Sequence, residues 1–235
     1  MDTSFYTAVR GAMTQQSHMD VLSNNIANIN TTGYKTKNGM FQHLMYYNLH
    51  AGEDADVKRQ AGTGAVLQRT DIDFTESPVM KTSGAWDFAI DGTGFFALRD
   101  PQNNEISYTR AGDFKICQRQ DGFYLTDTQG RFVLDASGNV IRYNSGKLSA
   151  DPAVYDFRST VGMLGVGDNR YVPTEKNGRA FLAESTKLVK GVLETSNVDL
   201  ASELAKVIES SRAYAYILKM VQTSDEVEQT INSLR

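Results

Sequence analysis

The chain has 235 residues, a length that allows one or two domains with a substantial core. Its 24 Lys and Arg residues are outnumbered by 28 Asp and Glu residues, for a net charge of −4. This balance lacks the basic footprint that proteins use to bind nucleic acid or an anionic membrane. The single cysteine, Cys117, excludes an internal disulfide, and its strand-like surroundings predict a small buried side chain.

The N-terminal segment has no basic region followed by a continuous apolar run, so no cleavable secretory signal is recognisable. No apolar run approaches the roughly 18 residues that a membrane span requires, so we expect no membrane insertion. These features predict a cytosolic protein, unless it is exported by a route that needs no cleaved signal.

Near the N-terminus, apolar residues recur at steps of three and four, the spacing of one face of an amphipathic helix. Asp, Thr or Ser at positions 2–4 is expected to cap its start. The segment SNNIANINTTGYK (23–35) predicts its end, because asparagine competes for backbone hydrogen bonds and Gly33 adopts a positive φ easily. The stripe is interrupted only by Gln16, and its apolar members are Phe5, Val9, Ala12, Met19, Leu22, Ile26 and Ile29.

The middle of the chain has short apolar runs separated by turn-forming segments, about 8 to 12 residues apart, which predicts antiparallel strands and hairpins. Residues 36–80 are interpreted as a polar connecting segment with one helical patch at residues 41–47. Residues 148–192 are interpreted as strand and loop. The predicted turns are at 91–94, 100–105, 119–122, 127–130, 135–139 and 144–147.

Helical spacing returns near the C-terminus, where no Gly or Pro occurs from residue 192 onward and Ser196 or Asp199 can cap a helix. Roughly 36 residues at about 1.5 Å each would extend roughly 54 Å. That length exceeds what a compact domain of this size covers along one side. The stripe also contains Ser211 and Ser224, and its apolar members are Leu200, Leu204, Val207, Tyr214, Leu218, Val221, Val227, Ile231 and Leu234.

These patterns predict a mixed α and β fold, in which long N- and C-terminal helices pair as a coiled-coil-like element and a β-rich antiparallel domain lies between them in sequence. The expected parts are a terminal-helix core (1–35 and 195–235), a connecting segment (36–80) and a β-rich outer domain (81–194). The simplest partners for the two stripes are each other and the same stripes on neighbouring chains. An isolated chain is expected to have exposed apolar surface or mobile ends, because a helix without a packing partner is marginal.

Candidate catalytic and metal-binding residues form no convincing site in the sequence. His18, His43 and His50 are not accompanied by an HExxH motif or a Cys/His cluster. Asp71 and Asp73 have the spacing of an acid/base pair on one strand face, although such a pair is more often solvated. We therefore expect no enzymatic activity, no cofactor and no metal. The alternative is a cell-wall-associated carbohydrate-binding or hydrolytic β module with helical oligomerisation ends.

Three separated blocks of the sequence resemble the flagellar axial proteins, which are the rod and hook subunits. SNNIANINTTGYK is similar to their N-terminal signature, WDFAIDGTGFFAL (86–98) followed by YTRAGDF (108–114) to their middle, and residues 191–227 to their C-terminal block. The blocks occur in the right order and cover about half of the chain. The short connecting segment favours a rod subunit over a hook subunit, and SNVDL (196–200) favours the distal over the proximal type.

The resemblance implies a structural subunit of the bacterial flagellar basal-body rod. Such subunits are exported through the flagellar type III apparatus without a cleaved signal. They assemble with copies of themselves and with other rod and hook subunits into a helical tube that spans the periplasm and cell wall. The tube transmits torque and conducts exported proteins, with the terminal helices as its inner layer and the β-rich middle as its outer layer.

The resemblance also implies roles for individual residues. The apolar stripes would form the assembly interface. The signature residues would end the first helix, redirect the chain outward and satisfy backbone and intersubunit hydrogen bonds. Where the family commonly has Glu after Arg-Ala-Tyr, this chain has Ala215, so an intersubunit salt bridge expected there loses its carboxylate. The signature residues are Asn24, Asn25, Asn28, Thr32 and Gly33.

Overall fold

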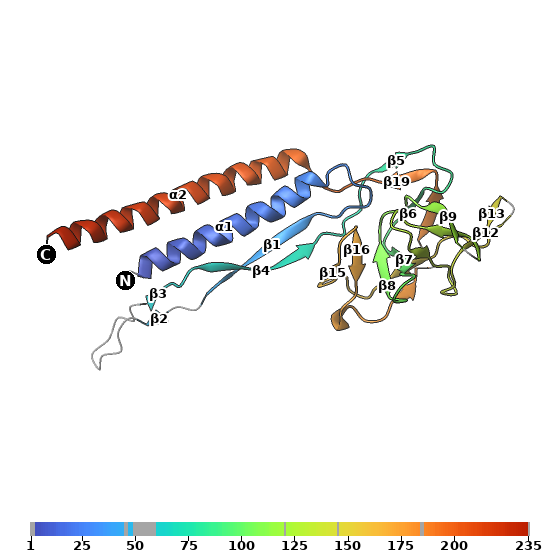
Figure 1. Ribbon diagram of the computed structural model, residues 1–235, viewed down its shortest axis with the longest axis horizontal. Coiled ribbons are helices and arrows are strands. Elements are labelled where there is room, and N and C mark those ends of the chain that lie inside the picture. Colours follow the sequence, from blue (N-terminus) through green and yellow to red (C-terminus); the bar gives the residue numbers. More distant parts are fainter. Residues whose placement is uncertain are drawn as a thin grey trace. The chain divides into compact units, whose positions relative to one another are not determined.

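The computed structural model describes residues 3–44, 47–48, 60–119, 121–144, 146–183 and 186–234 (Figure 1). The chain divides into two compact units, the first made of residues 1–27, 37–71 and 199–235 and the second of residues 28–36 and 72–198. This division differs from the expected one because residues 37–71 group with the helices and residues 28–36 with the β-rich unit. That residues 36–80 act as a connecting segment stays a prediction.

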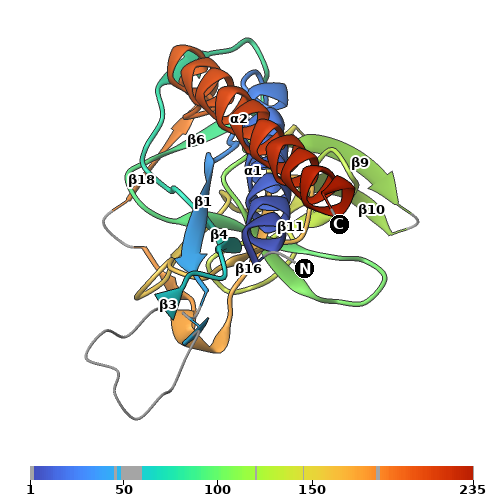
Figure 2. The ribbon, with the colours of Figure 1, turned by 90° about the vertical axis from the view of Figure 1, so that its left-hand side faces the viewer.

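The first unit is built on two long helices, α1 (Thr3–Ala27) and α2 (Leu200–Ser233), which lie side by side (Figures 1 and 2). α1 begins within the predicted cap region and ends in the Asn-rich segment. α2 begins after Asp199, whose carboxylate accepts a 3.1 Å hydrogen bond from the Ala201 N–H and caps the helix as predicted. Within the described residues, neither helix is long and apolar enough to cross a bilayer.

Strands β1 (Lys37–His43) and β4 (Ala65–Ile72) form a two-stranded sheet, and β1 contacts α1. The predicted helical patch at 41–47 is therefore wrong for residues 41–43, which end β1, and for Tyr47, which lies in a strand. The Phe41 ring packs edge-on against His18 of α1 with ring centroids 5.0 Å apart, a tertiary contact that local sequence does not encode. Residues 45 and 46 lie outside the described residues, and β2 (Tyr47–Asn48) pairs with β3 (Gln60–Ala61).

The second unit is β-rich, and its strand pairings are antiparallel, as predicted. Its largest sheet has eleven strands, eight of them in the order β13-β12-β10-β11-β7-β8-β16-β15. These eight are β7 (Phe95–Arg99), β8 (Ile106–Thr109), β10 (Gly122–Thr126), β11 (Phe132–Val133), β12 (Arg142–Asn144), β13 (Lys147–Leu148), β15 (Leu164–Gly165) and β16 (Arg170–Val172).

The other strands extend this sheet or form two smaller ladders. In the large sheet, β9 pairs with β10, and β14 pairs with both β7 and β17. Separately, β18 pairs with β6 and β19 with β5. Their bounds are β5 (Val79–Lys81), β6 (Phe88–Asp91), β9 (Lys115–Arg119), β14 (Val154–Asp156), β17 (Phe181–Leu182), β18 (Lys187–Lys190) and β19 (Val192–Glu194), with a short 3-10 helix, η1 (Glu175–Asn177). All six predicted turns separate strands in this arrangement.

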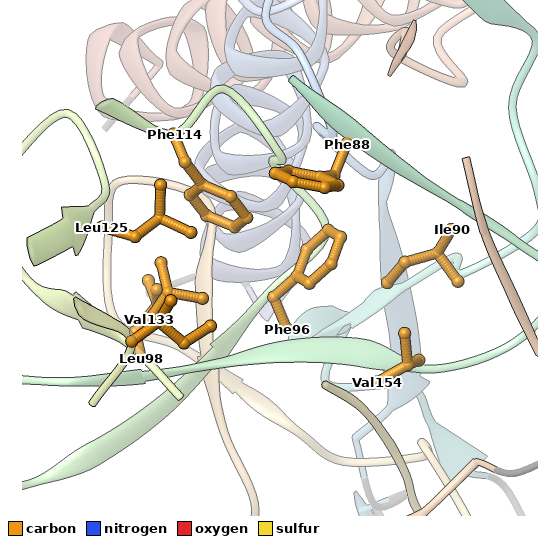
Figure 3. Packing of buried hydrophobic residues seen from close by; sticks show 9 residues of the cluster. Phe88, Ile90, Phe96, Leu98, Phe114, Leu125, Val133 and Val154 are labelled. Carbon is orange, nitrogen blue, oxygen red and sulfur yellow. The ribbon is translucent and has the colours of Figure 1, made fainter. Parts of the chain in front are cut away.

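Two apolar clusters form the core of the second unit, and β7 is buried between them. Phe96 and Leu98 belong to the first cluster, whereas Phe95 and Ala97 belong to the second, because successive side chains of a strand point to opposite faces. Figure 3 shows the first cluster, in which the rings of Phe96 and Phe114 are 5.1 Å apart. Cys117 is only half-buried, so its predicted burial is wrong, because β9 pairs with β10 alone among the described strands.

Candidate functional site

The helices α1 and α2 run antiparallel with a repeating contact every seven residues. Three contacts set the register and join Gly11 to Ile217, His18 to Ser210 (3.1 Å) and Asn25 to Glu203 (2.9 Å). Each step of seven residues forward along α1 is matched by seven residues back along α2. A repeat of seven is the spacing at which two helices keep one seam in contact by winding around each other with a left-handed twist.

The α2 helix extends past the first residue of α1, since it has 34 residues and α1 has 25. Continuing the register places Thr3, where α1 begins, opposite residue 225. Residues 203, 210 and 217 of α2 define a contact line toward α1. Ile231 lies two steps of seven after Ile217 on the same line, past the residue opposite the start of α1. Its side chain is 60 % exposed, and Val227 and Leu234 beside it are 56 % and 83 % exposed.

Apolar residues of α2 occupy two neighbouring faces rather than the single predicted stripe. The face toward α1 includes Val207, Tyr214 and Val221, which are half-buried. The uncovered residues of the predicted stripe are Leu200, Leu204, Leu218, Val227, Ile231 and Leu234, and Ile208, outside that stripe, is uncovered too. When apolar residues cover two adjacent faces of a helix, steps of three and four lead from residues of one face to residues of the other. The spacing in the sequence therefore predicted a single stripe where the structure has two faces.

The predicted stripe of α1 is used mainly within the chain. Leu22 is buried, and Phe5, near the start of the helix, is exposed. Val9, Ala12, Met19 and Ile26 are half-buried. The larger apolar surface left without cover in this unit is therefore on α2.

Asn25 is the centre of a buried polar cluster in the first unit. Its side-chain amide accepts a hydrogen bond from the Lys37 N–H (3.0 Å) and donates to the Lys37 carbonyl (2.9 Å), which fixes the start of β1. The same amide nitrogen donates to Glu203, which also pairs with Lys206 at 2.6 Å. An amide side chain carries both a donor and an acceptor. Asn25 can therefore satisfy the N–H and the carbonyl of Lys37 and also donate to the Glu203 carboxylate. These hydrogen bonds of Asn25 are made within the chain.

His18 lies between the two helices and β1, one seven-residue step before Asn25. Its Nδ1 is 3.1 Å from the Ser210 hydroxyl, and its ring meets that of Phe41. Burial lowers the pKa of His18, and the nearby Lys206 ammonium lowers it further, against a smaller opposing effect of Glu203 and Glu209. The neutral imidazole is therefore favoured in the folded helix pair.

In the second unit, Lys35 is fully buried and makes three polar contacts. Its ammonium donates to the Thr75 carbonyl (2.6 Å), the Ser77 hydroxyl (3.1 Å) and the Glu194 carboxylate (2.7 Å). Burial lowers the pKa of Lys35, partly opposed by the hydrogen bond to Glu194.

The guanidinium of Arg110 reaches the same carboxylate, with its Nη1 3.4 Å from Glu194, and donates to the Gly92 carbonyl at 2.9 Å. Lys35, Arg110 and Glu194 come from the N-terminal, middle and C-terminal blocks quoted above, so one buried ion cluster joins all three. None of these three residues was predicted as a site residue. Lys35 is the one charged residue of the segment 23–35, whereas the other two blocks carry several charges, so only Lys35 offered a signal in the sequence.

The signature turn also packs against the other two blocks. Gly33 has φ +65, and a Cβ added there would lie 2.4 Å from the Ala111 nitrogen, so the close approach requires glycine. The Gly33 N–H donates to the Glu194 carbonyl (2.9 Å), and the Thr32 carbonyl accepts from Asn169 (3.0 Å). Of the other predicted residues, Asn28 is half-buried and accepts from the Thr31 hydroxyl at 3.2 Å, and Asn24 is exposed.

The acidic residues considered for catalysis have separate partners. Asp71 pairs with Arg69 at 3.0 Å, and hydrogen bonds from Thr75 lower the pKa of the Asp73 carboxyl. Among the side chains that the structure describes, no group of three or more His, Cys, Asp or Glu residues could hold a metal ion. His50 lies outside the described residues.

The structure combines two antiparallel terminal helices, which carry uncovered apolar faces, with a β-rich unit. In the β-rich unit, residues of the three sequence blocks meet at a buried ion cluster. These features together define a subunit built for assembly.

Three family models match the chain. "Flagella basal body rod protein" matches residues 5–35, "Flagellar hook protein FlgE/F/G D1 domain" residues 89–153, and "Flagellar basal body rod FlgEFG protein C-terminal" residues 189–234.

Relatives match over the whole chain. The flagellar basal-body rod protein FlgG of Buchnera aphidicola subsp. Acyrthosiphon pisum is 30 % identical, covering 100 % of both chains. FlgG of Bacillus subtilis is 28 % identical over 99 % of this chain and 98 % of its own, and FlgF of Caulobacter vibrioides 29 % over 98 % and 96 %. The chain belongs to the flagellar basal-body rod protein family, and its function is that of a structural rod subunit. Nothing in the comparisons favours the carbohydrate-binding or hydrolytic alternative.

Proposed function

We propose that this rod subunit polymerises through the uncovered apolar faces of its terminal helices, without enzymatic activity. Its partners are copies of itself and other flagellar rod and hook subunits. The product is a helical tube, with the helices as a coiled-coil-like inner layer and the β-rich unit as the outer layer. The tube transmits torque and conducts exported proteins.

The observation that carries this proposal is the apolar surface of α2. Leu204, Ile208 and Leu218 are 45 %, 55 % and 40 % exposed on one helix, and residues 226–233 continue past the start of α1. Large apolar side chains gathered on one surface mark an interaction site, because burying them in a partner is favourable. The contact line through Ile217 and Ile231 supports the same conclusion. α1 covers this line at Ile217, and a second copy of the chain could cover it at Ile231.

The antiparallel contacts at intervals of seven residues support coiled-coil-like pairing. Each interhelical contact between subunits is weak, and the sum over a helical lattice is large, which suits a shaft that transmits torque. The assembly interface of this proposal is the predicted set of stripe residues on both helices, with the uncovered members on α2 contributing most.

The proposal includes export through the flagellar type III apparatus without a cleaved signal peptide, and a location that spans the periplasm and cell wall. Membership of the basal-body rod family supports both, because rod subunits act outside the cytoplasm. The SNVDL segment (196–200) supports a place in the distal rather than the proximal rod.

The test is Leu218→Asp, which places a charge on the uncovered face. The control variants are Leu218→Met, which keeps the face apolar, and Thr223→Asp, which adds the same charge at an exposed polar position. We expect Leu218→Asp to leave the β-rich unit folded, by circular dichroism and Trp86 fluorescence, and to abolish both polymerisation and motility in a complementation assay. A motile strain that carries Leu218→Asp would contradict the proposal.

A further inference from the structure

One face of the large sheet gathers arginines and aromatic rings from neighbouring strands. Tyr124 of β10 is the register partner of Arg142 of β12, and Phe132 of β11 is the partner of Arg99 of β7. Thr126, two residues after Tyr124, is the partner of Phe132. Cross-strand partners share a face, as do alternate residues of one strand, so all these side chains lie on the same side of the sheet.

Arg119 of β9 joins this face. Its neighbour two residues away, Cys117, is the register partner of Tyr124. The intervening residue of β10, Leu125, points to the opposite side and belongs to the apolar core. On β10 the arginine face is therefore the side opposite the first apolar cluster, and on β7 it continues the side of Phe95 and Ala97, so core packing fixes the strands that carry it.

The aromatic rings hold two of the guanidinium groups in place. The Arg142 Cζ lies 5.5 Å from the ring centroid of Tyr124, and the Arg119 Cζ lies 5.8 Å from that of Phe132. The two rings are themselves 5.1 Å apart. Stacking uses the flat side of a guanidinium and leaves the N–H groups at its edge available to a ligand.

The three arginines have few acceptors of their own. Arg99 donates to the Gly138 carbonyl (2.9 Å) and Arg119 to the Gly130 carbonyl (3.2 Å). Within the part of the chain that the structure describes, none of the three forms an ion pair with a carboxylate. Arg131 shows the contrast, because it pairs with both Asp127 (2.9 Å) and Asp168 (3.0 Å).

Arg99, Arg119 and Arg142 line one hollow of about 700 Å³, which we call the arginine hollow, together with Pro101, Asp121, Tyr124, Phe132, Asn139 and Val140. Three positive charges against the single carboxylate of Asp121 make it locally basic in a chain of net charge −4. A guanidinium edge matches the two oxygens of a carboxylate, so the hollow is complementary to carboxylate groups. Tyr124 is only 8 % exposed, which leaves little ring surface for stacking a neutral sugar.

We propose that the arginine hollow docks an acidic peptide segment of a partner protein, whose Asp or Glu carboxylates supply the ion pairs that the three arginines lack within the chain. The site goes beyond the helix-mediated assembly proposed above and is independent of it, because every residue of the hollow belongs to the second unit. Loss of binding at the hollow and loss of polymerisation through α2 are therefore separate outcomes.

The test uses the purified full chain and a fluorescein-labelled hexaglutamate peptide, with hexaglutamine as the uncharged control, and measures fluorescence anisotropy. We expect hexaglutamate to bind and hexaglutamine not to bind. Arg119→Gln and Arg142→Gln should each weaken hexaglutamate binding by about tenfold or more, since each removes a charge-assisted contact. Arg179→Gln, which removes an exposed arginine outside the hollow, should leave the affinity within about twofold.

Equal weakening by Arg179→Gln would mean that net charge alone attracts the peptide and would overturn the proposal. So would equal binding of the two peptides. Tighter binding of an oligogalacturonate of matched charge would assign the hollow to a carboxylated glycan and overturn the peptide occupant. If a variant fails to fold, NMR titration of the unaltered chain with hexaglutamate decides: shifts at the three arginine side chains support the site, and shifts confined elsewhere overturn it.

Discussion

Lys35 and Glu194 lie 159 positions apart in the sequence and form a buried ion pair of 2.7 Å, with both side chains almost fully shielded from solvent. Arg110 shares the same carboxylate, so two positive charges depend on one negative charge. The signature lysine therefore acts together with the C-terminal block, by fixing the segment after α1 against β19. A buried ion pair contributes little net stability, but removal of one partner leaves a buried charge without compensation.

The first prediction compares the two partners of this pair. Glu194→Gln leaves both Lys35 and Arg110 without a counter-charge, and we expect it to reduce the free energy of unfolding by about 3–5 kcal/mol. Lys35→Met leaves Arg110 paired with Glu194 and should cost less, about 1–3 kcal/mol. Urea unfolding followed by Trp86 fluorescence measures both. A larger loss for Lys35→Met than for Glu194→Gln would show that Arg110 does not share the carboxylate in solution.

The second prediction concerns Gly33, with Gly138 as its matched control. Both have a positive φ, +65 and +75, but only at Gly33 would a Cβ collide with backbone, whereas nothing lies within 4 Å at Gly138. Gly138→Ala should cost about 1 kcal/mol, which is the conformational penalty alone. Gly33→Ala should cost more than about 2 kcal/mol, because the segment after α1 must also move away from Ala111. If Gly33→Ala and Gly138→Ala lowered the midpoint of thermal unfolding equally, the close approach of Gly33 to the Ala111 backbone would be excluded.

Much of the fold could be predicted because its signals are local. Both helices, with the end of α1 and the cap of α2, follow from apolar spacing and local residue types, and each predicted turn contains Gly, Asn or Asp between apolar runs. The helical patch at 41–47 failed because a short apolar run has the same composition in a strand and a helix. The pairing of Lys35 with Glu194, or of Asn25 with Glu203, has no periodicity to reveal it, since the partners meet only after the chain has folded.

The two faces of α2 show a further limit. Spacing alone identified the helix as amphipathic but could not say which apolar residues face α1, because the choice depends on the register set by contacts such as Asn25 with Glu203. Leu204 and Leu218 are therefore uncovered, while Val207 and Val221 of the same predicted stripe are half-buried.

The third prediction is that the stability of the first unit depends on pH because of His18. Its folded pKa lies below the ordinary value of 6.5, so the unfolded chain binds this proton more readily than the folded chain. The contribution of His18 to stability is therefore complete above pH 6.5 and is lost as the pH falls below that value. Unfolding monitored at 222 nm between pH 7.5 and 5 should show this loss.

The His18→Gln variant provides the control for this titration. It retains polar side-chain atoms near Ser210 but removes the titrating group, so it should flatten this part of the pH profile. The carboxylates of Glu203 and Glu209 favour the protonated imidazole, but burial and Lys206 outweigh them. Stability that increases between pH 7 and 5.5, and does so only in the unaltered chain, would mean that the carboxylates dominate in solution.

The last prediction separates packing within the chain from packing between chains along one line of α2. Ile217 is half-buried against Gly11, whereas Ile231, two steps of seven further on, lies past the start of α1 and is 60 % exposed. Ile217→Asp should destabilise the isolated chain by about 2–4 kcal/mol, because it buries a charge in the helix contact. Ile231→Asp should change monomer stability by less than about 0.5 kcal/mol and yet prevent polymerisation, because the partner that would cover this position is another subunit. Urea unfolding and sedimentation of the two variants test the pair, and polymers formed normally by Ile231→Asp would exclude this end of α2 from the subunit interface.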